Sequence, residues 1–127
     1  MSRLFGPTFD LVESSMRFRV ARQAVLSSNV AHSDTPGYRR FDLTFDELVA
    51  NRAERLTRSD PRHMPAAGAD GYTLERGEYG SRPDRNGVDL DQELLTLSRN
   101  AGSFTEQAEV LSRLLSLRRI AVTGEPR

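Results

Sequence analysis

Few residues of this chain belong to the types that carry out acid–base, nucleophilic or metal chemistry. The 127 residues include two histidines and no cysteine, so thiol catalysis, thiolate metal sites and disulfides are excluded. His32 and His63 lie far apart, and neither has a neighbour at the spacing of metal ligands. Asp84, Asp89 and Asp91 lack the glycine and the terminal glutamate of a calcium loop. The sequence therefore predicts no enzyme, no metal site, no cofactor and no small-molecule substrate.

The polar segment 27–40 offers hydrogen-bonding chemistry instead, at the end of a predicted N-terminal helix. The Pro-Gly pair at 36 and 37 predicts a type II turn, since glycine tolerates the positive φ of the third turn position. We expect the side chains of Asn29 and Ser33 to hydrogen-bond the unpaired carbonyls at the helix end. Tyr38 is expected to pack back while its hydroxyl stays in water. On its residues alone, the segment indicates a helix stop rather than a binding motif.

The helix that positions this segment is predicted from about Thr8 to Ser33. Residues four and three apart form one apolar stripe on it, the spacing that keeps side chains on one face. Pro7 fits a helix entrance, and Asp10 with Glu13 resembles a capping box. Polar residues interrupt the stripe midway, which indicates either a core helix with a polar defect or a seam that other subunits complete. The stripe consists of Phe5, Phe9, Val12, Met16, Arg19, Gln23, Leu26 and Val30.

A second helix is predicted from Asp89 to about Val122. Asp89 with Gln92 resembles a capping box, and the four-three alternation that follows is typical of a coiled-coil seam. Gly102 interrupts this helix and is expected to permit close approach of another backbone. Further leucines lie off the seam, so one partner helix is not expected to cover all the apolar surface. The seam consists of Leu90, Leu94, Leu97, Ala101, Phe104, Ala108, Leu111, Leu115, Arg118 and Val122.

The middle of the chain has a different composition. A short helix is predicted from Thr44 to Leu56, with Thr44 and Glu47 as its capping box. Residues 57–86 are rich in Gly, Pro, Asp and Arg, and only the stretch 72–75 alternates like a strand. The predicted fold is therefore mainly α. Its long terminal helices pair as a coiled-coil hairpin (residues 1–35 and 87–127), and residues 36–86 form a turn, a short helix and a small loop-rich or β insert.

Composition points to a protein that works by association. The formal net charge is zero, which argues against binding nucleic acid through phosphate neutralisation. The mean hydropathy is −0.55 and the chain has no tryptophan, so we expect partners to help bury its apolar faces. Its start lacks the apolar run of a secretory signal, and no stretch reaches transmembrane length.

Several motifs resemble a known family. The run from Ser28 to Tyr38 is similar to the Asn-Ile-Ala-Asn-x-x-Thr-Pro-Gly-Tyr signature of the flagellar rod and hook axial proteins. His32 departs from it, since asparagine is more usual there. The segment 57–64 resembles a Pro-x-His segment of proximal rod members of that family. The run from Asn86 to Leu94 resembles their Asn-x-Val-Asp-Leu-Asp-x-Glu-Met helix opening.

The resemblance implies a structural subunit of the proximal rod in the bacterial flagellar basal body, which transmits torque and contributes to the axial export channel. It implies export by the flagellar type III apparatus without signal cleavage, a periplasmic location and self-association. The implied partners are other rod subunits of the FlgC, FlgF and FlgG type, the FliE adaptor, the MS ring and the export gate. A cytoplasmic helical-hairpin export chaperone or adaptor stays the alternative.

Three sets of residues carry these expectations. The signature predicts a junction between the helical core and the insert, formed by Asn29, Ala31, Thr35, Pro36, Gly37 and Tyr38. The assembly seam is predicted to consist of Phe9, Val12, Met16, Leu26, Val30, Leu90, Leu94, Leu97, Phe104, Leu111 and Leu115. Phe5 and Phe9 match a short hydrophobic export signal of rod and hook subunits, although the same two residues are also the start of the helical stripe.

Overall fold

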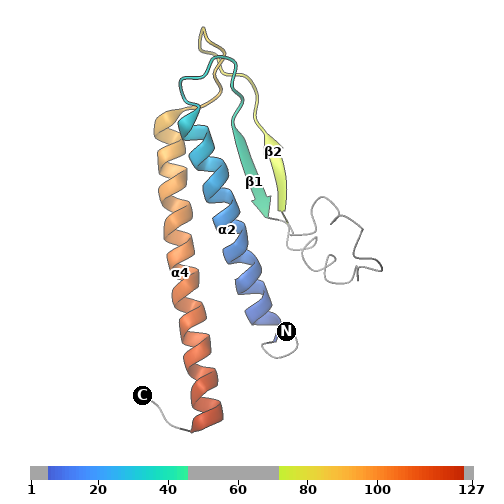
Figure 1. The fold of residues 1–127 in the computed structure, drawn as a ribbon, viewed down its shortest axis with the longest axis vertical. Helices are drawn as coiled ribbons and strands as arrows, with labels where there is room; N and C mark the ends of the chain where they lie inside the picture. The colour runs from blue at the N-terminus through green and yellow to red at the C-terminus, as the bar shows by residue number, and fades with distance from the viewer. Residues whose placement is uncertain (1–5, 46–71, 125–127) are drawn as a thin grey trace, which may run out of the picture.

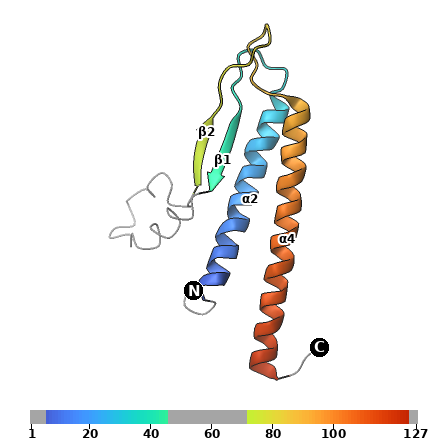
Figure 2. The same ribbon diagram turned by 180° about the vertical axis from the view of Figure 1, so that it is seen from behind.

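The computed structural model describes residues 6–45 and 72–124 of the chain, and these form two long helices and a small sheet (Figure 1). In chain order the elements are α2 (Pro7–Ala31), β1 (Phe41–Phe45), β2 (Tyr72–Arg76) and α4 (Leu90–Thr123). The two helices lie side by side and run in opposite directions, and α2 lies between α4 and the sheet in both views (Figures 1 and 2). The expectation of a mainly helical fold is confirmed.

Helix α2 begins where the chain leaves a left-handed turn. Gly6 has a φ of +79°, and Pro7 follows as the first helical residue, a position where the missing N–H costs nothing. No side chain caps this helix, so the predicted capping box of Asp10 and Glu13 is wrong. Glu13 instead pairs with Arg17 on the next turn. The helix ends at Ala31, two residues before the predicted end.

Helix α4 begins and ends at well-formed caps. The side chain of Asp89 accepts a hydrogen bond of 3.2 Å from the backbone N–H of Gln92, which confirms the predicted start. At the other end, Gly124 has a φ of +71° and its N–H bonds to the carbonyl of Ile120. Gly102 lies on an exposed part of the helix, and an added Cβ there would have no atom within 4 Å. The expected close backbone approach at Gly102 is therefore absent from the described chain.

The sheet corrects part of the sequence prediction. Strand β2 confirms the expected strand character of residues 72–75, and it pairs antiparallel with β1, with Leu43 opposite Leu74. Thr44 was predicted to begin a helix, but it belongs to β1. The remainder of that predicted helix lies outside the described residues. The sheet packs on α2 through the ring of Phe45, whose centroid is 5.3 Å from that of Phe18.

Polar side chains occupy the face of α4 that lies against α2. Glu93 and Asn100 are buried, Gln107 is half-buried, and the three recur at heptad spacing. The Asn100 amide donates to a backbone carbonyl of α2 and to Gln23 Oε1, each at 2.9 Å. The Gln107 amide donates to Ser15 Oγ at 2.7 Å. Hydrogen bonds therefore hold much of this interface, rather than packed leucines.

The apolar line predicted on α4 lies beside this polar line, not on it. Its members Leu97, Phe104 and Leu111 are half-buried at the interface with α2. The buried apolar core of the described residues is correspondingly small, and as many polar as apolar residues are buried. That core consists of Phe18, Leu26, Leu43 and Val88. Three predicted seam residues are about half exposed, namely Leu90, Leu94 and Leu115.

Candidate functional site

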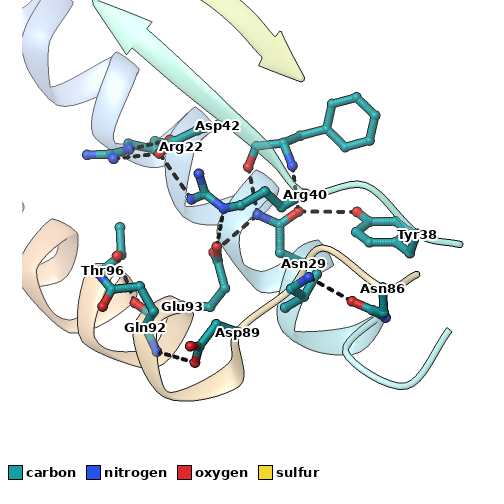
Figure 3. A network of polar contacts seen from close by, with 12 residues as sticks. Arg22, Asn29, Tyr38, Arg40, Asp42, Asn86, Asp89, Gln92, Glu93 and Thr96 are labelled. Atoms are coloured by element: carbon teal, nitrogen blue, oxygen red, sulfur yellow. Dashed lines mark hydrogen bonds and ion pairs between the residues drawn. The ribbon is translucent and has the colours of Figure 1, made fainter. Parts of the chain in front are cut away.

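A buried polar network, which we call the junction, joins the end of α2, the start of α4 and the chain that leads into β1 (Figure 3). Its members are Arg22 and Asn29 of α2, Tyr38, Arg40 and Asp42 of the segment that follows, and Asn86 and Glu93 near the start of α4.

Asn29 is at the centre of the junction and is fully buried. Its amide nitrogen donates to the carbonyl of Phe41 at 2.6 Å and to Glu93 Oε2 at 3.1 Å. Its oxygen accepts from the Phe41 N–H at 3.0 Å and from the Tyr38 hydroxyl at 3.2 Å. Both N–H donors and both lone pairs of the amide are thus used. The Asn29 side chain therefore links α2 to the start of β1 through hydrogen bonds. The Tyr38 hydroxyl was expected to stay in water, but it donates a hydrogen bond to Asn29.

Two arginine–carboxylate contacts surround this amide. Glu93, only 1% exposed, receives the Nε–H of Arg40 on its other oxygen. The Asp42 carboxylate accepts two parallel hydrogen bonds from Arg22, of 2.7 and 2.8 Å. A terminal nitrogen of Arg40 lies 3.4 Å from the same carboxylate. Planar guanidinium forks match carboxylates in this way. The buried acid on α4 is therefore neutralised by a residue of the insert.

The arginines lower the pKa of Asp42. Burial by itself raises the pKa of this carboxyl, but the hydrogen bonds from Arg22 and the Leu43 N–H, with the charges of Arg22 and Arg40, outweigh it. The hydrogen bond to Asp42 in turn raises the pKa of Arg22. Burial works against the charge on Arg40, yet the contact with Glu93 raises its pKa. These shifts all favour the charged forms of Asp42, Arg22 and Arg40.

Asn86 closes the C-terminal end of α2. Its buried amide nitrogen lies 2.9, 3.0 and 2.7 Å from the carbonyls of His32, Ser33 and Thr35. These carbonyls follow the last residue of α2, and those of His32 and Thr35 also accept from the backbone N–H groups of Thr35 and Tyr38. The sequence led us to expect Asn29 and Ser33 to bond them, which is wrong. The cap comes from a residue far along the chain, and it fixes the loop before α4 to the end of α2.

The Pro-Gly turn at residues 36 and 37 forms as predicted, and the loop before α4 makes backbone hydrogen bonds to it. Gly37 has a φ of +69°, as the third position of a type II turn requires. Its N–H donates to the Asp84 carbonyl at 2.8 Å, and the Gly87 N–H donates to the Tyr38 carbonyl at 2.8 Å. At Gly80 an added Cβ would lie 1.8 Å from a backbone carbonyl oxygen, so only glycine fits. Two backbone segments therefore cross here in direct contact.

His32, at the position where the family signature more usually has asparagine, packs against Tyr38. Its ring stacks on that of Tyr38, with centroids 4.5 Å apart and planes within 6°. Its Nδ1 lies 2.7 Å from the carbonyl of Ser28, so that nitrogen carries the proton. The imidazole covers the outer face of the tyrosine whose hydroxyl bonds Asn29.

The structure divides the predicted junction residues into two groups. Asn29 and Tyr38 anchor the network, whereas the other four are exposed, namely Ala31, Thr35, Pro36 and Gly37. Of the predicted export signal, Phe5 lies outside the described residues, and Phe9 is half-buried beside Leu114 and Leu115. The predicted seam of α2 lies towards α4, with Leu26 buried and the others half-buried: Val12, Met16 and Val30.

Sequence reasoning missed most of the junction. Arg22, Arg40 and Asp42 were not singled out, and Asn86 and Glu93 were noted only as part of a family motif. One indication was present in the sequence: Glu93, Asn100 and Gln107 recur at heptad spacing, which predicts a polar line along one face of α4.

Neither metal nor membrane chemistry emerges from the part of the chain that the structure describes. Within residues 6–45 and 72–124, no three acidic or histidine side chains come together as a metal site would require. In the same ranges, neither helix combines the length and the apolar character needed to cross a bilayer.

An elongated pair of helices, closed at one end by a buried network of arginines, carboxylates and amides, defines a helical structural subunit. No protein-family model matches the chain, but proteins of one kind do. The flagellar basal body rod protein FlgB of Proteus mirabilis (strain HI4320) is 30% identical over 117 residues, which cover 81% of this chain and 82% of that protein. The chain therefore belongs to the FlgB family of flagellar basal body rod proteins.

Two further relatives span nearly the whole chain. FlgB of Bacillus subtilis (strain 168) is 26% identical over 125 residues, covering 95% of this chain and 97% of that protein. FlgB of Aeromonas hydrophila is 28% identical over 131 positions, covering 98% and 99%. These matches confirm the resemblance seen in the motifs. The chain is a structural subunit of the basal body rod and not an enzyme.

Proposed function

We propose that this chain is a subunit of the proximal rod that assembles through its two long helices. In this proposal the helices form a coiled-coil core (residues 1–35 and 87–127), while residues 36–86 form an insert whose angle the junction sets. The subunit transmits torque and lines the axial export channel. Its neighbours are copies of itself, rod subunits of the FlgC, FlgF and FlgG type, the FliE adaptor and the MS ring. It reaches the periplasm through the type III export gate without signal cleavage, and Phe5 with Phe9 serve as the export signal.

The observation that supports assembly most strongly is the apolar surface of α4. Leu117 is 64% exposed and Val122 is 81% exposed, and apolar surface exposed in this way is typical of protein–protein interaction sites. Exposed leucines occur on several sides of this helix, whereas its buried residues are polar. Burial of apolar surface is the main favourable term in subunit association. Neighbouring helices packed on these faces would remove that surface from water.

A groove between the helices supports the same proposal. It is lined on one side by Met16 and Val20 of α2 and on the other by Phe104 and Leu111 of α4. It continues along the pair past Ala24. Polar residues such as Glu13 and Gln23 also line it, but most of its exposed surface is apolar, so a helix from an adjacent subunit would pack favourably in it.

Fractionation of flagellated cells tests the proposal against the alternative of a cytoplasmic export chaperone. Basal bodies purified from cells that make an epitope-tagged chain should contain it at a fixed ratio to other rod subunits, and the tag should appear in the rod density. A chain found only in the cytosol, and absent from basal bodies that are otherwise complete, would support the chaperone alternative instead.

A further inference from the structure

A second cluster lies outside the junction, at the end of the molecule where the chain turns (Figure 1). It joins Tyr79 and Arg85 of the loop between β2 and α4 to Arg39, which precedes β1. Tyr79 is about half exposed. The guanidinium carbons of Arg39 and Arg85 each lie 5.1 Å from the centre of its ring. We propose that Arg39, Tyr79 and Arg85 form a recognition site for the carboxylates of an acidic segment on a neighbouring protein.

Neither of these arginines has a carboxylate partner among the described residues, a property they share with Arg76 of β2, which stacks on Phe41. Arg22 and Arg40 are engaged in the junction, and Arg82 lies 3.4 Å from Asp84. Among the residues that the structure describes, no ion pair involves Arg39 or Arg85. Arg39 uses its Nε–H on the carbonyl of Gly77, which leaves its terminal nitrogens for another acceptor.

Two positive charges gather around one aromatic ring here. Each guanidinium is attracted to the ring of Tyr79, and two positive charges at one place attract a negatively charged partner. Guanidinium groups bind carboxylates through two parallel hydrogen bonds. The chain has no net charge, so the site is a local recognition feature rather than part of a general polyanion surface.

The backbone holds Arg85 in a fixed and unfavourable conformation. Its φ is +58°, the one positive value at a non-glycine position in the described residues. Its N–H donates to the Arg82 carbonyl at 2.8 Å, and its carbonyl accepts from the Gly80 N–H at 3.3 Å. Glycine would adopt this conformation without strain. What arginine adds is a charged group in a fixed place, and such preorganisation favours binding.

Calorimetric titration of the purified full-length chain with a hexaglutamate peptide tests the site. We expect saturable binding that weakens as salt is added, and a loss of about tenfold or more in the Arg39→Gln, Arg85→Gln double variant. The matched control is Arg99→Gln, an exposed arginine on α4, which should bind as the unaltered chain does. Absence of binding by the unaltered chain, or equal losses in the control, would overturn the proposal.

Arg85→Gly separates recognition from a purely structural role. Recognition predicts weaker peptide binding with an unchanged or higher melting temperature, because glycine relieves the backbone strain. If instead the melting temperature falls enough to explain the lost binding, the packing of Arg39 and Arg85 on Tyr79 only stabilises the loop. Inorganic phosphate that binds as tightly as the peptide would contradict carboxylate recognition. These results are independent of whether the faces of α4 form the rod interface.

Discussion

The junction and the rest of the helix pair differ in whether their buried polar atoms have hydrogen-bond partners and in how many leucines are exposed. At the junction, buried polar atoms have partners, and Asn29 uses every donor and acceptor that it has. Along the rest of the pair, which we call the shaft (α2 before residue 22 and α4 after residue 96), three buried polar atoms have no partner, while Leu115 and Leu117 are exposed. The unpartnered atoms in the described chain are Arg19 Nε, Asn100 Oδ1 and Gln107 Oε1.

This difference indicates which part of the subunit is complete by itself. Unpaired buried polar atoms cost free energy, and exposed leucines contribute none of the free energy that burial would supply. The junction therefore supplies the local fold, whereas the shaft leaves apolar surface whose burial against a neighbour would be stabilising. Four substitutions or conditions test the comparison on the isolated chain, in order of expected effect.

Glu93→Ala should be the most damaging change at the junction. It leaves the Arg40 guanidinium and one N–H of Asn29 without their buried partner, a loss of about 3–5 kcal/mol in the free energy of unfolding. Urea denaturation followed by circular dichroism measures it. Glu106→Ala, an exposed change on the same helix, should stay within about 0.5 kcal/mol of the unaltered chain. Equal effects at the two sites would mean that the junction is not the stable region.

Asn86→Ala should come next. It removes a buried amide that bonds three carbonyls just after α2, so we expect a loss of about 2 kcal/mol. Hydrogen exchange should show faster opening of the last turn of α2. Asp34→Ala, an exposed change in the same turn, is the matched control. Unchanged protection of that turn in Asn86→Ala would contradict the capping role.

The lowered pKa of Asp42 predicts a dependence of stability on pH. In the unfolded chain an aspartate titrates near its ordinary value of about 3.9, and in the folded chain its pKa lies below that. Its stabilising contribution is therefore complete above the ordinary value and declines as the pH falls through the folded pKa. Denaturation between pH 6 and pH 2.5 should show this decline, and Asp42→Asn should flatten it. An equally steep decline in Asp42→Asn would assign it to other carboxyls.

Gly102→Ala should have the smallest effect, and a favourable one. The glycine is exposed inside α4 and an added methyl group meets nothing within the chain, so the helix should gain up to about 1 kcal/mol. A thermal melt of the isolated chain measures it. A loss of stability would indicate that this part of α4 is not a regular helix in solution.

Parts of the fold could be predicted because their causes are local. Pro7, the cap at Asp89 and the long apolar periodicity placed both helices within two residues of their observed ends. Strand β1 was missed because the Thr44–Glu47 pair imitates a helix cap, whereas the competing alternation of Phe41, Leu43 and Phe45 is short.

The junction could not be predicted for a different reason. It joins Asn29 to Glu93 and Asn86 to the end of α2, and such long-range pairs have no spacing rule in a single sequence. The polar line on the inward face of α4 was not predicted, because the heptad pattern was followed along the apolar residues alone. Heptad periodicity identifies a face for packing, but it does not say whether the packing partner belongs to the same chain.

The central claim is that exposed leucines of the shaft belong to contacts between subunits, while the junction supports the fold of one chain. Leu117→Glu tests it most directly, because Leu97 and Leu111 partly face α2 and would confound folding with assembly. We predict that the isolated variant keeps its free energy of unfolding within about 0.5 kcal/mol, while cells that carry it build no rod and do not swim; Ser116→Glu should leave both intact. Normal rods and swimming in cells with Leu117→Glu would contradict the claim.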